Sequence, residues 1–382
     1  MSADDRTTPS GTWAFIAGGG TAGHTLPGIA VAQALVAEGH DASSIRFVGS
    51  ERGSESRLVS EAGFQISVLP GRGIERKVSL QNVASAWALL RAQKQALGLV
   101  RRHRPSVVLA LGGFASLATA FAAVACRIPV VVAEQNAVAG AANRLVAKRA
   151  VACAVAFEGT GLPNAHLTGN PVRAEILAVD PADRAAARRA LGLPTDATVV
   201  LAFGGSLGSR RINQAVFGFV EALSERADVA VHHVVGSRDW GSREGAPPTL
   251  PKGGLHYQAV EYEQDMARAM AAADLVVSRA GATTVAELSV VGLASILVPL
   301  PIASEDHQTA NARALVDADA AVLVPDAELD AHRLVAEVGA LLAGEDTLGR
   351  MAAAARALGR PDAAERVADL VGSAATGELS RG

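Results

Sequence analysis

The chain has 382 residues, which is more than one hydrophobic core usually serves, so we expect two domains. Its 35 basic and 38 acidic residues give a formal net charge of −3, and this balance excludes a partner held by phosphate neutralisation, such as a nucleic acid. Cys126 and Cys153 have no CxxC or Cys/His spacing, which argues against a disulfide framework or a zinc site. The polar N-terminus does not resemble a secretory signal, and a reducing cytoplasm fits best.

Short apolar runs alternate with longer helical patterns from end to end, as in βαβ units on a parallel sheet. The uncharged stretch 107–126 is long enough to cross a bilayer, but Gly112-Gly113 divides it, so we interpret it as a strand, a turn and a helix. The predicted fold class is α/β, with two doubly wound parallel-sheet domains. The expected strands are 13–17, 45–48, 66–69, 107–111, 130–133 and 150–155, and then 198–203, 230–235, 255–259, 275–278, 295–298 and 321–324.

The boundary between the two series is expected near the segment Gly169-Asn170-Pro171-Val172-Arg173, which leads into a helix-containing connection. We therefore place the N-terminal domain at 11–172 and the C-terminal domain at 173–360. A last helix is predicted at about 361–375.

The first strand ends in the motif Gly18-Gly19-Gly20-Thr21-Ala22-Gly23-His24, which fits GxGxxG. Glycines at this place expose backbone N–H groups at a helix N-terminus, where an anion is favoured. An oxidoreductase that binds a dinucleotide would also have an acidic residue after the second strand, and Glu51 could supply it. His24 distinguishes this turn, because histidine is the usual base at neutral pH, although it could also be a solvated helix-start residue.

Two further turns leave apolar strands and enter helices. In the turn 203–210, Ser206 could donate to a phosphate oxygen, or the loop could be a tight turn with a serine cap. In the turn 278–287, Glu287 lies in an apolar register, where a carboxylate needs a partner such as a vicinal diol. Glu287 could instead form a capping box with Thr283 or Thr284.

Two polar clusters follow strand ends, where open parallel sheets bind ligands, although either could be an ordinary polar loop. The first is Glu134-Gln135-Asn136, and the second is Glu305-Asp306-His307-Gln308 with Asn311. No second histidine at ligand spacing supports a metal site at Asp306 and His307.

In this order the motifs resemble those of the MurG family of GT-B glycosyltransferases, and the match spans nearly the whole chain. The family uses UDP-N-acetylglucosamine (UDP-GlcNAc) to glycosylate the C4 hydroxyl of undecaprenyl-linked lipid I, with inversion. The resemblance implies two Rossmann-like domains that face each other across a cleft, with the last helix packed back on the N-terminal domain. The matching motifs are GGGTAGH (18–24), GGF (112–114), EQN (134–136), GNPVR (169–173), GGSLG (204–208), RAGATTVAE (279–287) and DHQTANA (306–312).

The resemblance also implies roles for individual residues. Ser206 and Arg173 would lie near the diphosphate, the ribose would meet Glu287, and the uracil would meet the backbone near Glu263, where the family can have an apolar residue. His24 is the candidate base, with Glu134 and Asp306 as alternatives. The phosphates would be surrounded by Ala282, Thr283, Thr284, Val285 and Ala286; the sugar would lie near His307, Gln308 and Asn311; and Thr21, Ala22, Gly23 and Asn136 would approach from the N-terminal domain.

The resemblance implies no cofactor, and any divalent cation would be auxiliary because no DxD-like motif is present. It places the enzyme on the cytoplasmic face of the bacterial membrane, bound peripherally to anionic lipid. The stretch 72–102 suits such contact, with Leu80, Val83, Trp87 and Leu90 at helical spacing near Arg72, Arg76, Lys77, Arg91 and Lys94, or it forms a helix packed on its own sheet. The alternatives are another enzyme that uses a UDP-sugar, such as an epimerase or a natural-product glycosyltransferase, and a nucleotide-sugar-binding regulator without turnover.

Overall fold

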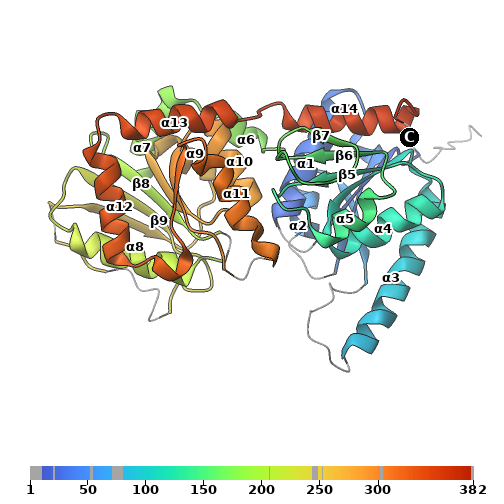
Figure 1. Ribbon diagram of the computed structural model, residues 1–382, viewed down its shortest axis with the longest axis horizontal. Helices are drawn as coiled ribbons and strands as arrows, with labels where there is room; N and C mark the ends of the chain where they lie inside the picture. Colours follow the sequence, from blue (N-terminus) through green and yellow to red (C-terminus); the bar gives the residue numbers. More distant parts are fainter. Residues whose placement is uncertain are drawn as a thin grey trace, which may run out of the picture. The chain divides into compact units, whose positions relative to one another are not determined.

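The computed structural model describes residues 11–19, 22–51, 55–70, 81–205, 207–242, 248–251, 253–301 and 304–379, with the backbone alone at 22, 81–90 and 304. The chain divides into two compact units. Unit 1 comprises Met1–Arg173 and Asp362–Gly382, and unit 2 comprises Ala174–Pro361. Each unit is built around one parallel sheet (Figure 1).

The sheet of unit 1 has the strand order β3-β2-β1-β4-β5-β6-β7, and every pairing is parallel. The order reverses direction between β1 and β4, which makes the carboxyl ends of these two strands the topological switch point. The strands are β1 Ala14–Gly18, β2 Ile45–Ser50, β3 Gln65–Leu69, β4 Val107–Gly112, β5 Val130–Glu134, β6 Ala152–Val155 and β7 Ala165–Leu167.

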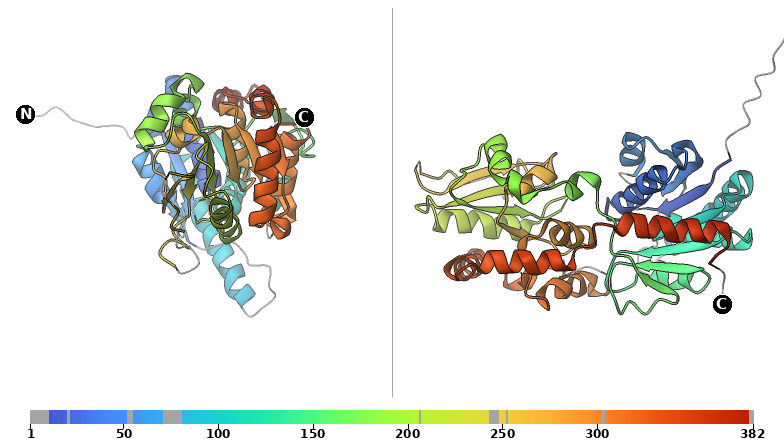
Figure 2. Two further views of the ribbon diagram at one scale, coloured as in Figure 1. Left: turned by 90° about the vertical axis from the view of Figure 1, so that its left-hand side faces the viewer. Right: turned by 90° about the horizontal axis from the view of Figure 1, so that it is seen from above.

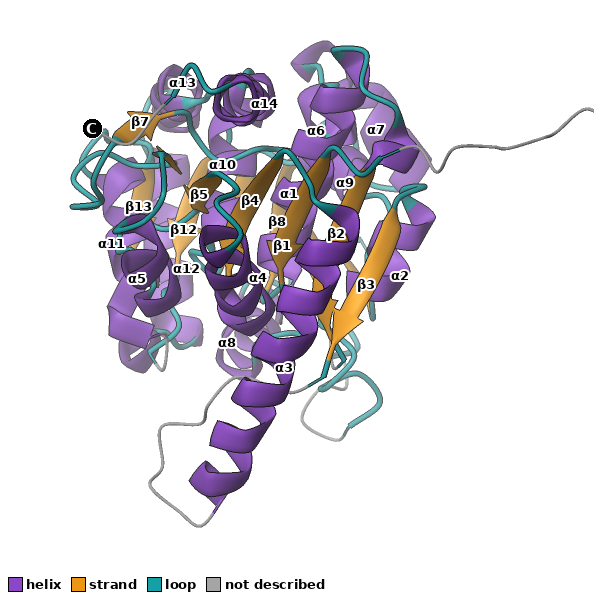
Figure 3. Cartoon of the chain, turned by 90° about the vertical axis from the view of Figure 1, so that its right-hand side faces the viewer, coloured by secondary structure: helices purple, strands orange, loops and turns teal. Residues whose placement is uncertain are grey.

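Helices cover both faces of this sheet (Figure 3). Side chains alternate along β1, so that Ala14 and Ile16 join one apolar cluster and Phe15 and Ala17 join the other. The first cluster includes α1 and α2, and the second includes α3, α4 and α5. The helices are α1 Ala22–Ala37, α2 Glu55–Glu61, α3 Gln81–His103, α4 Gly113–Ala125 and α5 Ala141–Ala147.

The last helix of the chain, α14 Ala363–Thr376, belongs to unit 1. It lies beside α1 and packs against β4, β5 and β6, so it covers part of one face of the unit 1 sheet (Figures 1 and 2). Its apolar face carries Val367, Ala368 and Val371, all almost fully buried in the cluster that contains Ile16 and Leu109.

The sheet of unit 2 has the order β10-β9-β8-β11-β12-β13, again entirely parallel, with its switch point between β8 and β11. The strands are β8 Thr198–Phe203, β9 Val229–Val234, β10 His256–Val260, β11 Leu275–Ser278, β12 Ala294–Leu297 and β13 Ala321–Leu323. The helices are α6 Ala174–Leu177, α7 Arg184–Leu191, α8 Arg210–Ala222, α9 Met266–Ala272, α10 Ala282–Val291, α11 His307–Val316, α12 Ala331–Ala343 and α13 Thr347–Leu358.

The predicted α/β class with two doubly wound parallel sheets is confirmed. The stretch 107–126 is a buried strand, β4, followed by α4, and no helix in the described part of the chain has an apolar stretch long enough to cross a membrane. Strand β7 was not predicted from the sequence, because its three residues are mostly exposed at the sheet edge and lack an apolar run.

Candidate functional site

The switch point of unit 2 brings two of the predicted turns together, because β8 and β11 are hydrogen-bonded neighbours. After β8, Gly205 and Gly208 have positive φ angles of 91° and 78°, which a side chain would disfavour. The helix α8 that follows is capped by Ser209, whose Oγ accepts from the backbone N–H of Ile212 at 3.5 Å. Ser206 lies outside the described residues. The turn 203–210 does contain a serine that caps the following helix, and this residue is Ser209.

The turn after β11 leads into α10, whose N-cap is Gly281 and which has no side-chain cap. The Oγ1 atom of Thr283 in its first turn is buried without a hydrogen-bond partner in the structure. Ala282 and Val285 are buried, and Thr284 and Ala286 are partly buried. A helix N-terminus with uncapped N–H groups and an unpaired hydroxyl is suited to an anion with several oxygen atoms.

Glu287 is only 5% exposed and lies in the second turn of α10. The capping-box alternative is wrong, because the N-cap is Gly281 and neither Thr283 nor Thr284 occupies that position. The carboxylate is thus held on the rigid part of the helix, less than two turns from the uncapped N-terminus.

Arg279 holds these turns together, a role that was not predicted from the sequence. Its Nη1 donates to the carbonyl oxygens of Val298 and Pro299 at 3.0 and 3.1 Å, and its Nη2 donates to Ser209 Oγ at 2.7 Å. It also forms a 2.6 Å ion pair with Asp326. One guanidinium therefore connects the segments that follow β8, β11 and β12.

The predicted residues after β12 divide into supporting and open positions. Asn311 is fully buried, and its Nδ2 donates to the carbonyl of Ala280 at 3.2 Å, so it holds α11 against the turn after β11. Gln308 accepts at Oε1 from the backbone N–H of Leu300 at 2.9 Å. His307 is the first residue of α11 and is partly buried.

Asp306 is exposed, and it accepts from Thr309 Oγ1 at 2.7 Å. Both Glu305 and Asp306 have positive φ angles, 57° and 52°, which are uncommon for residues with a side chain. Such strain at a strand end often accompanies a binding site.

In unit 1, the switch point places the turn after β1 against the turn after β4. Gly113 has a φ of 81°, and a Cβ on it would lie 2.6 Å from the carbonyl oxygen of Gly19. A Cβ on Gly112 would lie 3.3 Å from Nε2 of His24 and 3.5 Å from both polar atoms of the Asn143 amide. His24 is therefore next to Gly112, on the third residue of α1, and it is partly buried. Thr21 is outside the described residues; Ala22 begins α1, and Gly23 is exposed.

Glu134 is 3% exposed, and both of its oxygens accept hydrogen bonds. Oε1 accepts from the backbone N–H of Asn136 at 3.0 Å and from its Nδ2 at 3.2 Å. Oε2 accepts from the backbone N–H of Gly140 and from Asn143 Nδ2, both at 2.9 Å. The carboxylate thus holds Asn136 and the loop before α5 in place, which suits a positioning group better than a general base.

Asn143 was not predicted, although it follows Glu134 by only nine residues. Its Nδ2 also donates to the carbonyl of Ala133 at 3.1 Å, and its buried Oδ1 has no hydrogen-bond partner in the structure. Arg173 is partly buried and is the last residue of the N-terminal stretch of unit 1.

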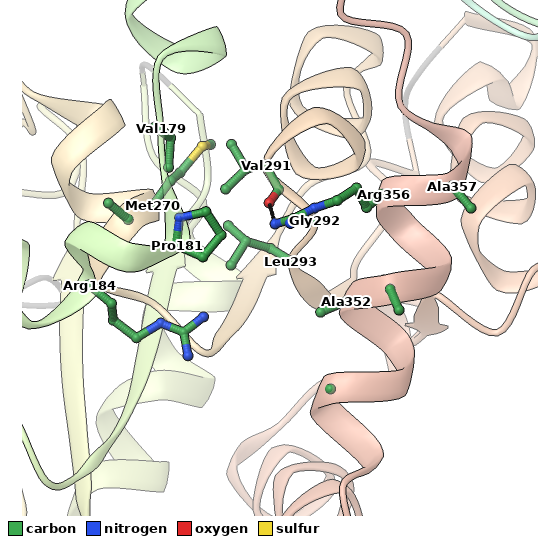
Figure 4. Close-up of a pocket in the computed structure, with 13 residues that line it drawn as sticks. Val179, Pro181, Arg184, Met270, Val291, Gly292, Leu293, Ala352, Arg356 and Ala357 are labelled. Carbon is green, nitrogen blue, oxygen red and sulfur yellow. Dashed lines mark hydrogen bonds between the residues drawn. The ribbon is translucent and has the colours of Figure 1, made fainter.

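A cavity of about 480 Å³ lies at the opposite, amino edge of the unit 2 sheet (Figure 4). Arg356 on α13 reaches into this region and donates from Nη2 to the carbonyl of Val291 at 2.6 Å. Arg184, Pro181 and Met270 line the other side. None of the residues predicted from the sequence lines this cavity, so we do not include it in the candidate site.

Two family models match the chain. The glycosyltransferase family 28 N-terminal domain matches residues 14–155, and the glycosyltransferase family 28 C-terminal domain matches residues 199–367. Each model thus covers most of one sheet and its helices.

Two relatives carry the name UDP-N-acetylglucosamine–N-acetylmuramyl-(pentapeptide) pyrophosphoryl-undecaprenol N-acetylglucosamine transferase. The one from Alkalilimnicola ehrlichii is 42% identical, over 93% of this chain and 96% of its own. The one from Desulforamulus reducens is 38% identical, over 92% of this chain and 95% of its own. The crystal structure of Acinetobacter baumannii MurG matches with a TM-score of 0.76 and 28% identity, over 94% of this chain and 99% of that one. The chain therefore belongs to glycosyltransferase family 28, and within it to the MurG family of N-acetylglucosamine transferases.

Proposed function

We propose that the protein transfers N-acetylglucosamine from UDP-GlcNAc to the C4 hydroxyl of the muramoyl sugar of undecaprenyl-linked lipid I, and so forms lipid II. Relatives named for this transferase activity, at 38 and 42% identity over more than nine-tenths of the chain, support the proposal. The structural observation on which it depends most is the switch point of unit 2. There, the N-termini of α8 and α10 follow neighbouring strands, and the buried Glu287 lies within two turns of the second.

The donor would bind unit 2 through contacts of three kinds. The uncapped N-terminus of α10 and the glycine turn before α8 would hold the diphosphate, with Ser206 as a further donor. Arg173, which belongs to unit 1, would be a second further donor. Glu287 would accept hydrogen bonds from the ribose hydroxyls, and the backbone near Glu263 would meet the uracil. His307, Gln308 and Asn311 would surround the transferred sugar.

In the reaction, the C4 oxygen of the acceptor forms a bond to the anomeric carbon, and the bond from that carbon to the diphosphate oxygen breaks with inversion. The electron pair leaves with UDP, whose new charge the helix N-termini and Arg173 would stabilise. The hydroxyl proton passes to a base, for which His24 is the candidate. Asp306 is an alternative base. Glu134 is the weaker alternative, because four N–H groups already occupy its oxygens.

The test combines purified protein, UDP-GlcNAc and a lipid I analogue. We expect release of UDP and a glycosylated product only when the acceptor is present. An epimerase would convert the donor without an acceptor, and a binding regulator would give no turnover with either.

The role of His24 is tested with His24→Ala and a matched control, His166→Ala, which removes an exposed histidine on the edge strand β7. We expect kcat to fall by about 10²–10⁴ in the first variant, the range for loss of a general base, and to stay unchanged in the control. Equal rates for both variants would eliminate His24 as the base.

We further propose peripheral binding to the cytoplasmic face of the membrane through anionic lipid. Arg72, Arg76, Lys77, Leu80, Val83, Trp87 and Leu90 are residues whose side chains lie outside the described part of the structure. The later part of α3 packs on its own sheet through Ala96 and Val100, whereas Arg91 and Lys94 are exposed. The double change Arg76→Glu and Lys77→Glu should weaken binding to anionic vesicles, and unchanged binding would contradict this proposal.

A further inference from the structure

Two adjacent histidines near the carboxyl end of β9 connect to different loops of unit 2. His232 and His233 are 2% and 0% exposed. Because successive side chains of a strand point to opposite faces, one ring lies on each side of the sheet. Neither residue was predicted from the sequence to belong to the site.

His233 is the centre of a chain of hydrogen bonds. Its Nε2 lies 3.0 Å from Asn213 Oδ1, and its Nδ1 lies 3.0 Å from the Tyr257 hydroxyl. Burial, together with the neighbouring His232, lowers the pKa of His233 to about 3, so the ring is neutral near neutral pH. The amide oxygen of Asn213 can only accept, so Nε2 carries the proton, and Nδ1 accepts from Tyr257.

This chain of hydrogen bonds ends in the turn 235–239, which follows β9. Asn213 Nδ2 donates to the carbonyl of Val235 at 3.0 Å and to Asp239 Oδ2 at 2.9 Å. The turn packs directly on the glycine turn after β8, because a Cβ on Gly208 would clash with the carbonyl oxygen of Val235. Arg238 adds a hydrogen bond from Nη2 to the carbonyl of Gly208 at 3.1 Å. His233 thus supports the turn that would hold the diphosphate.

His232 makes the corresponding connection on the other face. Its Nδ1 lies 2.9 Å from Gln258 Oε1, and its Nε2 lies 2.9 Å from Glu263 Oε2. Gln258 Nε2 donates to the carbonyl of Leu191, which fixes the orientation of that amide. Both nitrogens of His232 therefore face oxygen atoms, one on the Gln258 amide and one on the Glu263 carboxylate.

Glu263 passes this connection to the loop between β10 and α9. Its Oε1 accepts from the backbone N–H of Asp265 at 2.8 Å, and Asp265 caps α9 by accepting from the backbone N–H of Arg268 at 3.0 Å. The Glu263 side chain is 11% exposed and faces the interior, so its carboxylate shapes the loop and its backbone is left to meet a ligand.

We infer that His232 and His233 are positioning residues with separate tasks, His232 for the nucleobase loop through Glu263 and His233 for the diphosphate turn through Asn213 and Val235. The inference rests on the proposed function, because it takes a uridine diphosphate as the ligand of unit 2. The two histidines at the carboxyl end of β9 would thus position both the loop that meets the nucleobase and the turn that meets the diphosphate.

The separation of tasks is tested by titrating the full-length protein with UDP and with uridine, and comparing three proteins. In His233→Leu we expect the affinity for UDP to fall about tenfold while that for uridine is unchanged, so the ratio of the two affinities falls. In Glu263→Leu we expect both affinities to fall by the same factor, so the ratio is that of the wild type. The two variants serve as controls for each other.

Two further variants keep the test decisive if His233→Leu folds poorly. His233→Gln retains a donor and an acceptor and should bind both ligands like the wild type. Arg238→Met removes an exposed side chain that bonds to the carbonyl of Gly208 and pairs with Asp239 of the same turn, and it should lower the affinity for UDP and not for uridine. In the transfer assay, His233→Leu should raise the KM for UDP-GlcNAc and leave kcat within a factor of two.

The inference is overturned if His233→Leu and Arg238→Met weaken UDP and uridine equally or not at all, or if Glu263→Leu leaves uridine binding unchanged. Failure of the proposed function has a different result, since the wild-type protein would then give no acceptor-dependent release of UDP in the transfer assay, whatever the titrations show.

Discussion

Gly208 lies where two turns of unit 2 meet, and both its backbone angle and its surroundings exclude a side chain. Its φ is 78°, and a Cβ would clash with the carbonyl oxygen of Val235. A larger residue must push the turn after β8 away from the turn after β9. Because these backbone groups would hold the diphosphate, a small displacement there affects binding more than it affects the core.

We therefore expect Gly208→Ala to weaken UDP binding by at least tenfold in a calorimetric titration. Gly339→Ala is the matched control, because Gly339 lies within α12 with no atom near the position of its Cβ. Alanine is the better helix former, so the control should bind UDP normally and be slightly more stable. Normal UDP binding by Gly208→Ala would show that the turn does not contact the ligand.

Hydrogen bonds between elements also set how unit 2 responds to pH. The pKa of His233 is lowered to about 3 by burial, whereas a histidine in the unfolded chain titrates near 6.5. Between these pH values the unfolded chain binds a proton that the folded chain does not. The contribution of the neutral ring to stability is complete above pH 6.5 and is lost as the pH falls toward 3, by about 2 kcal/mol between pH 7 and pH 5.

Urea unfolding of the wild type and of His233→Gln at pH 7 and pH 5 tests this contribution. Trp13 and Trp87 are replaced by phenylalanine in both proteins, so that the fluorescence of Trp240 reports on unit 2. The difference in unfolding free energy between the two proteins should shrink as the pH is lowered. An equal difference at both pH values would exclude His233 as the titrating group.

A buried ion pair joins α7 to the base of the unit 2 sheet. Arg188 is 5% exposed, and its guanidinium donates to the carbonyls of Ala272, Thr195 and Ala197 and pairs with Asp274 at 2.5 Å.

Asp274→Ala leaves the charge of Arg188 buried without its partner, which typically costs about 3–5 kcal/mol. Asp228→Ala, in the exposed pair with Arg226, should cost less than about 1 kcal/mol. Urea unfolding of the two variants measures the contrast, and equal losses would contradict the assigned role of Arg188.

The sequence predicted the elements of each sheet well because each is determined locally. Buried parallel strands are continuous apolar runs, and the turns after them contain glycine where the backbone has a positive φ, as at Gly113 and Gly205. The contacts that hold the candidate site could not be found in this way. Arg279 meets Ser209, Pro299 and Asp326, which are distant in the chain, and only the order of strands in the sheet brings them together.

The same limit applies to Glu134 and Glu263, whose hydrogen-bond partners cannot be identified from their positions in the sequence. Glu134 follows a strand end, as a catalytic carboxylate would, yet its oxygens are taken by the loop that it supports. Glu263 lies 2.9 Å from His232, thirty-one positions earlier, while its backbone stays the proposed contact of the uracil. In both cases the partner decides the role, and the partner is known only from the fold.

At the scale of the whole molecule, the two units differ in how the chain builds them. Unit 2 is one continuous stretch, whereas unit 1 needs α14, which follows unit 2 in the sequence.

Val371→Asp places a charge at a fully buried position of α14 and should destabilise unit 1 by several kcal/mol. Glu365→Ala, at an exposed position of the same helix, is the control, and equal thermal stability of the two variants would contradict the assigned role of α14.

The position of α14 also determines which unit can fold first during synthesis. As the chain leaves the ribosome, the first part of unit 1 emerges early, but the helix that covers Ile16 and Leu109 is made only after the whole of unit 2. Unit 2 is complete once Pro361 has been made, so it can fold before α14 is available to unit 1. Ribosome-bound chains that stop soon after Pro361 has emerged should therefore protect residues 174–361 from protease before they protect the residues that precede them.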